Sequence, residues 1–316
     1  MSIPAEFRHP PHNRRLLPQV TVSTGAPTRV RQTGAMRIDL TTAPGDPEHP
    51  NEDYASVALP ASGSGGALVV MDGVTPPPDE AGCLHGVPWF TARLGGRMLE
   101  LSASRRDMTL RECLAESIAR TADFHRSSCD LSHVRTPQAT VVAARWDDSG
   151  VEHLVLSDSV LLVEGRDGEV TALLDDRLAQ LPPEVLSLRD AVRALPIGSP
   201  ERASLGAEYG RAVEVLRNAE GGFFTAAADP AAAGRALAGT VPRAEVRTVV
   251  ALTDGASRWV EVFGQGCWAD CVALIRKEGA DGLVRRVRAA ESADPDRKAF
   301  SRGKARDDAT VLFAEF

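Results

Sequence analysis

The sequence lacks an excess of basic residues and lacks any long apolar run. Lys and Arg number 36 against 43 Asp and Glu, which gives a formal net charge of −7 at pH 7. A general nucleic-acid-binding protein needs a basic face to meet phosphates, and a transmembrane helix needs about 18 or more consecutive apolar residues. We therefore expect neither a nucleic-acid partner nor a membrane partner.

Cysteine is sparse and is not arranged as in a secreted disulfide scaffold. The five cysteines are an odd number spread through the chain, whereas secreted scaffolds are denser and usually even. The first residues contain no apolar segment of the signal-peptide kind. Cys267 and Cys271 could share a helix face, but no second Cys/His pair has zinc-ligand spacing. These features predict a cytoplasmic protein whose cysteines are core residues.

Glycine-rich nucleotide-binding loops are absent too, because the chain contains no GxGxxG or Walker A motif, and this argues against a dinucleotide or P-loop enzyme. The chain is 43% hydrophobic and 25% charged, enough for a sizeable core. Residues 1–35 are rich in Pro, Arg, Thr and His without a sustained period, which predicts a mobile or partly attached arm. No boundary follows, so residues 36–316 are expected to form one domain.

The hydrophobic pattern after Met36 indicates strands, two helices, more strands, and then helices alternating with strands. The expected strands cover residues 36–42, 54–59, 66–71, 139–146, 152–157, 160–164, 169–174, 223–227, 246–253 and 310–316. After the two early helices, helical residues are expected at 186–219, from Pro230 onward and at 268–290. This order favours an α+β sandwich of mostly antiparallel sheets with helices outside.

Acidic residues stand at the ends of several expected strands. They are Glu52, Asp53, Asp72, Asp158, Asp254, Asp307 and Asp308. Carboxylates at the edge of a rigid core are costly to desolvate unless they are paired or bound to cations. Gathered at one edge they would form a hard oxygen-donor site that suits Mn²⁺ or Mg²⁺. Each Asp-Gly or Asn-Glu-Asp alone is more typical of a turn or a helix cap, so the signal lies in the whole set.

The motifs in their order resemble the metal-dependent protein phosphatase 2C family, in a divergent, bacterial-type form. The segments that carry the resemblance are Asn51–Tyr54, Val69–Gly73, Gln138–Val142, Leu156–Ser159, Ala251–Gly255 and Asp307–Val311. The resemblance runs from about residue 36 to the C-terminus. It implies a four-layer α-β-β-α sandwich of two mostly antiparallel sheets flanked by helices.

The resemblance also implies a role for each acidic position. Asp72 looks like the carboxylate that bridges two Mn²⁺ or Mg²⁺ ions, and the Gly73 carbonyl looks like a further ligand. The remaining implied ligands are Asp254 and Asp307 for the first ion, Glu52 and Asp53 for the second, and Asp158 for a third, weaker ion.

The implied reaction is hydrolysis of phosphoserine or phosphothreonine in proteins by a metal-bridged hydroxide, with Asp53 and Asp72 as catalytic residues. A general acid would help the leaving group. His49 is the candidate, with His85 as a second, although a surface or structural histidine is the plainer interpretation of either.

The phosphate-side residues depart from the family. No Arg stands in residues 45–50, where the family commonly places one that grips the phosphate, and the family's Gly-Asp-Ser-Arg reads Ser157-Asp158-Ser159-Val160. Lys304 and Arg306 could bind the phosphate, or could belong to a solvated loop. A phosphatase of a small phosphorylated metabolite and a non-catalytic binding module therefore remain alternatives. Residues 186–219 occupy the position of the family's flap and are expected to gate substrate.

Overall fold

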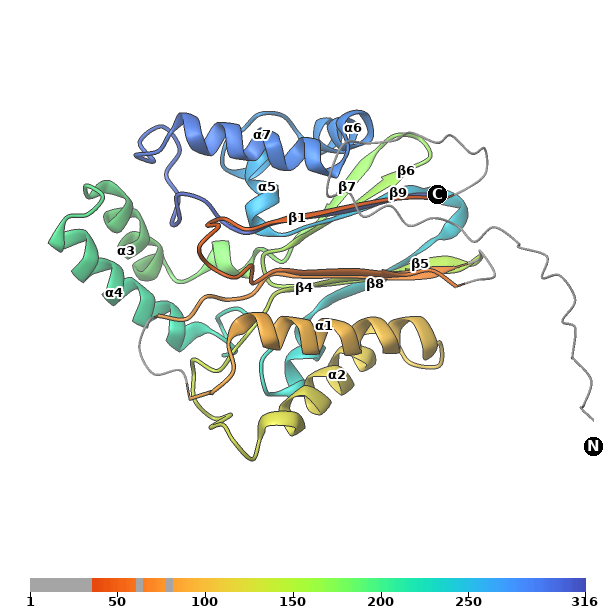
Figure 1. Ribbon diagram of the computed structural model, residues 1–316, viewed down its shortest axis with the longest axis horizontal. Coiled ribbons are helices and arrows are strands. Elements are labelled where there is room, and N and C mark those ends of the chain that lie inside the picture. Colours follow the sequence, from red (N-terminus) through yellow and green to blue (C-terminus); the bar gives the residue numbers. More distant parts are fainter. Residues whose placement is uncertain (1–35, 61–64, 78–81) are drawn as a thin grey trace, which may run out of the picture.

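The structure is a computed structural model that describes residues 36–60, 65–77 and 82–316 (Figure 1). The expected arm at residues 1–35 lies outside the described residues, so the domain boundary at residue 35 stays a prediction. None of the helices in the described ranges has both the length and the apolar character needed to span a bilayer.

Two five-stranded sheets form the centre of the molecule, and every strand pair in them is antiparallel. The first sheet has the order β1 (Arg37–Ala43), β10 (Ala309–Glu315), β9 (Val246–Leu252), β6 (Val160–Gly165) and β7 (Val170–Leu173). The second has the order β2 (Tyr54–Ala58), β3 (Gly66–Met71), β4 (Val141–Trp146), β5 (Gly150–Leu156) and β8 (Leu237–Pro242).

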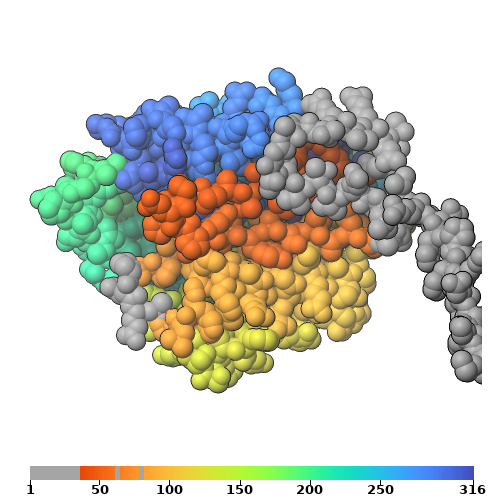
Figure 2. Space-filling model, viewed as in Figure 1, coloured from red at the N-terminus to blue at the C-terminus, as the bar shows by residue number. Residues whose placement is uncertain are grey.

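Helices cover the outer face of each sheet, and Figures 1 and 2 show the resulting layers. The second sheet is covered by α1 (Val87–Ser104) and α2 (Leu110–His125). The first sheet is covered by α5 (Asp254–Glu261), α6 (Trp268–Glu278) and α7 (Ala280–Ala293). Two further helices, α3 (Pro183–Ala194) and α4 (Pro200–Leu216), pack against each other at one end of the sandwich. The predicted α+β, four-layer α-β-β-α sandwich is confirmed.

The central strand β3 is apolar throughout because both of its faces are buried. In β3, Val69 and Met71 pack against the helices, whereas Leu68 and Val70 pack between the sheets. Successive side chains of a strand point to opposite faces, so a strand buried on both sides reads as a continuous apolar run. This is why β3 was visible in the sequence although its residues do not alternate with polar ones.

Several predicted elements differ in the structure. The helix expected at 268–290 is two helices, because Gly279 adopts φ of +85° between α6 and α7. The strand expected at 223–227 is only a pair of isolated bridges, and the helix expected at Pro230 is a short 3₁₀ helix, Pro230–Arg235. The sequence interpretation also missed β8, an edge strand that carries Pro242 and an exposed Leu237.

The prediction that the cysteines are core residues was only partly right. Cys113 and Cys271 are buried, but Cys267 is exposed and Cys83 and Cys129 are half-buried.

Candidate metal centre

Strand register brings the acidic strand ends to one edge of the sandwich. Tyr54 pairs with Met71, which puts Asp53 beside Asp72 at the same end of the β2–β3 pair. Leu252 pairs with Val311 and with Val160, so Asp254 emerges beside the start of β10 and the start of β6. Antiparallel pairing thus aligns the C-terminal end of one strand with the N-terminal end of its neighbour, and the expected gathering of carboxylates follows.

Asp72 lies at the centre of this acidic group. Burial raises the pKa of its carboxyl well above the ordinary value, and the negative charges of Asp254, Asp53, Asp158 and Asp307 raise it further. Four carboxylates are therefore close enough to Asp72 to repel its charge. Such a group is stable with all its charges only when cations lie among them.

Asp53 has one satisfied oxygen and one unsatisfied oxygen. The hydroxyls of Thr253 and Thr310 donate to Oδ2 at 3.0 and 2.6 Å. Oδ1 is buried and has no hydrogen-bond partner in the described part of the chain. Burial, with the charges of Asp308 and Asp254, raises the pKa of Asp53 to about 8 despite the two hydroxyl donors. A buried carboxylate oxygen without a donor fits a hard divalent cation.

Glu52 and Gly73 are held against each other. A Cβ atom on Gly73 would lie 2.7 Å from the carbonyl oxygen of Glu52 and 2.3 Å from Cγ1 of Val87, so only glycine allows this approach. The Thr75 hydroxyl donates to Glu52 Oε2 at 2.5 Å. Burial raises the pKa of Glu52 as well. Because the two segments touch, the Gly73 backbone and the Glu52 carboxylate can serve one site.

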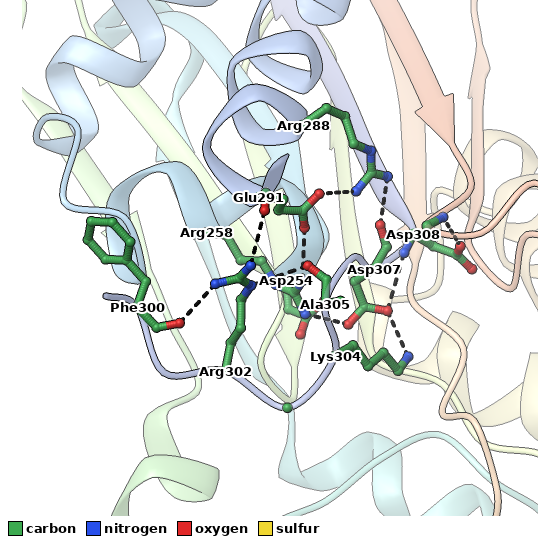
Figure 3. Close-up of polar contacts among 12 residues, drawn as sticks. Asp254, Arg258, Arg288, Glu291, Phe300, Arg302, Lys304, Ala305, Asp307 and Asp308 are labelled. Carbon is green, nitrogen blue, oxygen red and sulfur yellow. Dashed lines mark hydrogen bonds and ion pairs between the residues drawn. The ribbon is translucent and has the colours of Figure 1, made fainter. Parts of the chain in front are cut away.

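Asp307 is buried and paired with two cationic side chains (Figure 3). Arg258 donates to Oδ2 at 2.6 Å and Lys304 donates to Oδ1 at 2.7 Å. Burial and the charge of Asp254 nevertheless raise its pKa, against the opposing effects of the two cations. For a cation to bind Asp307, one of these two donors has to release its oxygen, and Lys304, whose side chain is half exposed, is the easier one to move.

Asp158 follows a strained turn. Ser157 has φ of +68°, a left-handed conformation that glycine adopts more easily. Its N–H donates to Asp175 Oδ2 at 2.8 Å, and that buried carboxylate fixes the turn. Burial and the charge of Asp254 raise the pKa of Asp158 to about 7. Asp158 is thus electrostatically linked to the group around Asp72.

The remaining predicted residues divide into those near the acidic group and those away from it. Lys304 contacts Asp307 and donates to Thr75 at 3.1 Å. Arg306 is exposed and donates instead to Ser292 at 3.0 Å. The side chain of His49 is 77% exposed and contacts Asp46 at 2.9 Å, so its side-chain contact among the described residues is with the surface and not with the acidic group.

His85, the second candidate for a general acid, lies in a separate cluster with Cys83, His125 and Cys129. Two further charged residues belong to the centre: Asp308, which the sequence placed in the acidic set without a role, and Arg217, which was not predicted. The N–H groups of Gly45 and Glu52 donate to the carboxylate of Asp308 at 2.8 and 2.6 Å, and the charge of Arg217 interacts with that of Asp158. Neither residue could be assigned a role from the sequence, because Asp308 is simply a second acid after Asp307 and Arg217 lies at the end of a polar helix, without a distinctive spacing to other residues.

Arg258 was also missed. It lies one helical turn after Asp254 in α5 and bridges Asp307 to Glu291, which accepts at 3.0 Å (Figure 3). The spacing of four residues between Asp254 and Arg258 would have placed both side chains on one face of a helix. The helix α5 was not predicted from the sequence, so this spacing was not used.

Comparisons with known proteins bear on the fold. No protein-family model matches the chain, and no curated protein matches it in sequence. Among solved structures, the serine/threonine phosphatase Stp1 from Staphylococcus aureus is similar with a TM-score of 0.55 at 12% identity, over 92% of this chain and 99% of that one.

Two other solved structures are similar over comparable lengths. The Mycobacterium tuberculosis serine/threonine phosphatase PstP/Ppp gives a TM-score of 0.52 at 15% identity, over 89% of this chain and 98% of that one. The serine-threonine phosphatase 2C from Toxoplasma gondii gives 0.54 at 14% identity, over 90% and 96%. The chain therefore has the fold of the metal-dependent protein phosphatases 2C.

Proposed function

We propose that this protein is a Mn²⁺- or Mg²⁺-dependent phosphomonoester hydrolase whose substrates are phosphoserine and phosphothreonine in proteins, and that it acts in the cytoplasm. The observation that carries the proposal is the buried, unpartnered Oδ1 of Asp53 beside the mutually repelling carboxylates around Asp72. A protein that only binds partners has no need to keep such a costly group.

Each residue of the carboxylate centre has a proposed role in the reaction. Asp254, Asp307 and the Gly73 carbonyl would hold one cation, Glu52 and Asp53 would hold a second, and Asp72 would contribute to both, with Asp158 available to a third. When bound, two such cations lower the pKa of a shared water and offset charge on phosphoryl oxygens. Asp53 and Asp72, which would help to hold the cations that share this water, are the proposed catalytic residues.

Lys304 is the proposed phosphate-binding residue. Its ammonium lies between Asp307 and Thr75, and its pKa is raised because the charges of Asp307, Asp72 and Asp254 outweigh burial. It therefore stays protonated and can orient a phosphoryl oxygen. Arg217 offers a second cation on the Asp158 side, where its buried Nε lacks a hydrogen-bond partner within the described residues.

A groove of about 520 Å³ between α3, α4 and residues 297–303 supports a protein substrate over a small metabolite. Its lining contains five arginines and no acidic residue: Arg189, Arg193, Arg202, Arg297 and Arg302. Residues 297–303 lead directly to Lys304. Although Arg302 is paired with Asp294, the other arginines make a groove that suits an acidic or phosphorylated segment of a protein, and residues 186–219 on its wall are proposed to gate that substrate.

The experiment compares hydrolysis of an aryl phosphate by the full chain with Mn²⁺, with chelator, and with Asp72→Asn. Turnover is expected with Mn²⁺ alone, and the exposed control Asp148→Asn should match the unmodified protein. Equal or absent turnover in every arm contradicts the enzyme and leaves the binding module. If turnover occurs, a preference for sugar or nucleotide phosphates over phosphopeptides contradicts the protein substrate and favours the metabolite alternative.

A further inference from the structure

A second group of metal-ligating side chains lies outside the carboxylate centre. It joins the residues just before α1 to the end of α2 and the turn that follows. Its members are Cys83, His85, His125 and Cys129. The Nδ1 or Nε2 and Sγ atoms of the four all lie within 4.8 Å of one another, and His125 is buried while the other three are half-buried. We propose that these four residues form a structural zinc site.

Three sulfur–nitrogen distances within the cluster fit tetrahedral zinc. Sγ of Cys83 lies 3.4 Å from Nδ1 of His125 and 3.6 Å from Nδ1 of His85, and Sγ of Cys129 lies 3.5 Å from Nδ1 of His85. With Zn–S near 2.3 Å and Zn–N near 2.0 Å, tetrahedral angles place sulfur and nitrogen about 3.5 Å apart. These three distances are those expected of ligands that share one zinc ion, and every other pair of ligand atoms lies within 4.8 Å.

Hydrogen bonding alone explains this arrangement less well. Nδ1 of His85 faces the sulfurs of both Cys83 and Cys129. An imidazole nitrogen carries either one proton or one lone pair, so it makes one good hydrogen bond and not two. A shared ion satisfies all the converging atoms at once.

Groups around the cluster fix its ligands as the outer contacts of a zinc site do. The N–H groups of Leu84 and His85 donate to the sulfurs of Cys129 and Cys83, each at 3.4 Å. Such backbone donors stabilise thiolates, which are the form that binds zinc. The ring of Trp89 stacks on that of His85 with centroids 4.0 Å apart and so fixes the imidazole plane.

The ligand set indicates both the metal and its role. Thiolate and imidazole ligands select zinc, whereas carboxylates select Mn²⁺ or Mg²⁺, so the two centres of this protein take different ions. Four protein ligands leave no open position for water or substrate, which is typical of a structural site.

A zinc ion here would fasten the start of α1 to the end of α2. The segment it holds leads into Val87, whose side chain packs directly against Gly73. The Asp130 N–H also donates to the Gly82 carbonyl at 2.7 Å, in the same junction. The site therefore supports the loop beside Asp72 and Gly73 without belonging to the carboxylate centre.

The first test is elemental analysis of the full chain purified without metal-chelating resin. One zinc ion per chain is expected, with zinc falling to near zero in Cys83→Ser, Cys129→Ser and His125→Ala. The matched control Cys267→Ser removes an exposed cysteine elsewhere and should keep its zinc. Asp72→Asn should also keep its zinc, and this separates the cluster from the carboxylate centre.

The second test uses unmodified protein, since the variants could fail to fold. Cobalt exchanged into the chain should give thiolate-to-cobalt charge-transfer bands and strong tetrahedral d–d bands, and a mercurial reagent should release one zinc per chain. A cobalt spectrum without thiolate bands, a Cys83–Cys129 disulfide, or zinc lost in Asp72→Asn but kept in the cysteine variants would overturn the proposal.

Discussion

The N–H of Glu52 donates to Oδ2 of Asp308 at 2.6 Å, across 256 residues of sequence. The other oxygen of Asp308 accepts the N–H of Gly45 at 2.8 Å. Asp308, the residue directly before β10, thus holds both ends of the loop that carries Glu52 and Asp53. The position of two proposed ligands therefore depends on a carboxylate that is not proposed as a ligand itself.

Replacing Asp308 should weaken metal binding without removing a ligand. Asp308→Ala leaves two backbone N–H groups without their acceptor, which costs about 1–3 kcal/mol of stability per lost partner and frees the Glu52 loop. A Mn²⁺ titration of activity should shift to higher concentration, and Asp308→Asn, which keeps one acceptor oxygen, should shift less. Superimposable titrations for all three proteins would argue against this positioning role.

The metal-free protein should lose stability as pH rises. The folded-state pKa values of Asp53 and Asp158 are about 8 and 7, above the ordinary carboxyl value of 3.8. Between the ordinary pKa and these raised values the folded state holds protons that the unfolded state has lost, so stability falls across that window. The melting temperature with chelator should therefore drop between pH 5 and 8.

Added Mn²⁺ should largely remove that pH dependence, because the cation replaces the protons. Asp53→Asn should flatten the metal-free profile since one raised carboxyl is gone. A chelated protein whose melting temperature is constant or rises over this range would show that the carboxylates do not repel one another as described.

Arg258 should be among the most important charges for stability. Its buried guanidinium bridges Asp307 and Glu291 at 2.6 and 3.0 Å. Removing one partner of a buried ion pair costs about 3–5 kcal/mol, because the remaining buried carboxylates lose a cation, although Asp307 keeps Lys304 and Glu291 keeps Arg288. Arg258→Met should show this loss in urea unfolding, whereas Arg126→Met, which breaks an exposed pair with Asp123, should change stability by about 1 kcal/mol or less.

Lys304 and Arg306 should differ in their effect on substrate. Lys304→Met should lower kcat/KM for an aryl phosphate by about tenfold or more, equivalent to about 1.4 kcal/mol of transition-state binding, and should weaken inhibition by inorganic phosphate. Arg306→Met should leave both unchanged because Arg306 contacts Ser292. If Arg306→Met were the variant that lost phosphate inhibition, the assignment to Lys304 would be wrong.

The acidic edge could be predicted because most of its carboxylates end or precede a buried strand, so that their positions follow from the local sequence pattern; Glu52 and Asp53, which precede the half-buried edge strand β2, are the exception. Asp72 directly follows the apolar strand β3, and Asp254 follows the apolar residues 249–252 and Thr253; antiparallel register then brings the two strand ends to the same edge. Asp308 and Arg258 could not be assigned, because their roles arise from contacts with residues far away in the chain. The cluster of Cys83, His85, His125 and Cys129 does have a sequence pattern, Cys83-x-His85 and His125-x₃-Cys129. The sequence prediction considered only the pair Cys267 and Cys271 and therefore did not include it.

The central claim is that the carboxylates around Asp72 hold a pair of divalent cations. Anomalous diffraction from crystals of the full chain grown with Mn²⁺ tests it most directly. Two manganese peaks about 3.5–4 Å apart are expected, both within ligand distance of Asp72, with Oδ1 of Asp53 on one of them and Lys304 moved from Asp307. The account is contradicted if no manganese peak lies beside Asp72, or if Asp307 keeps both Arg258 and Lys304 while Oδ1 of Asp53 stays without a ligand.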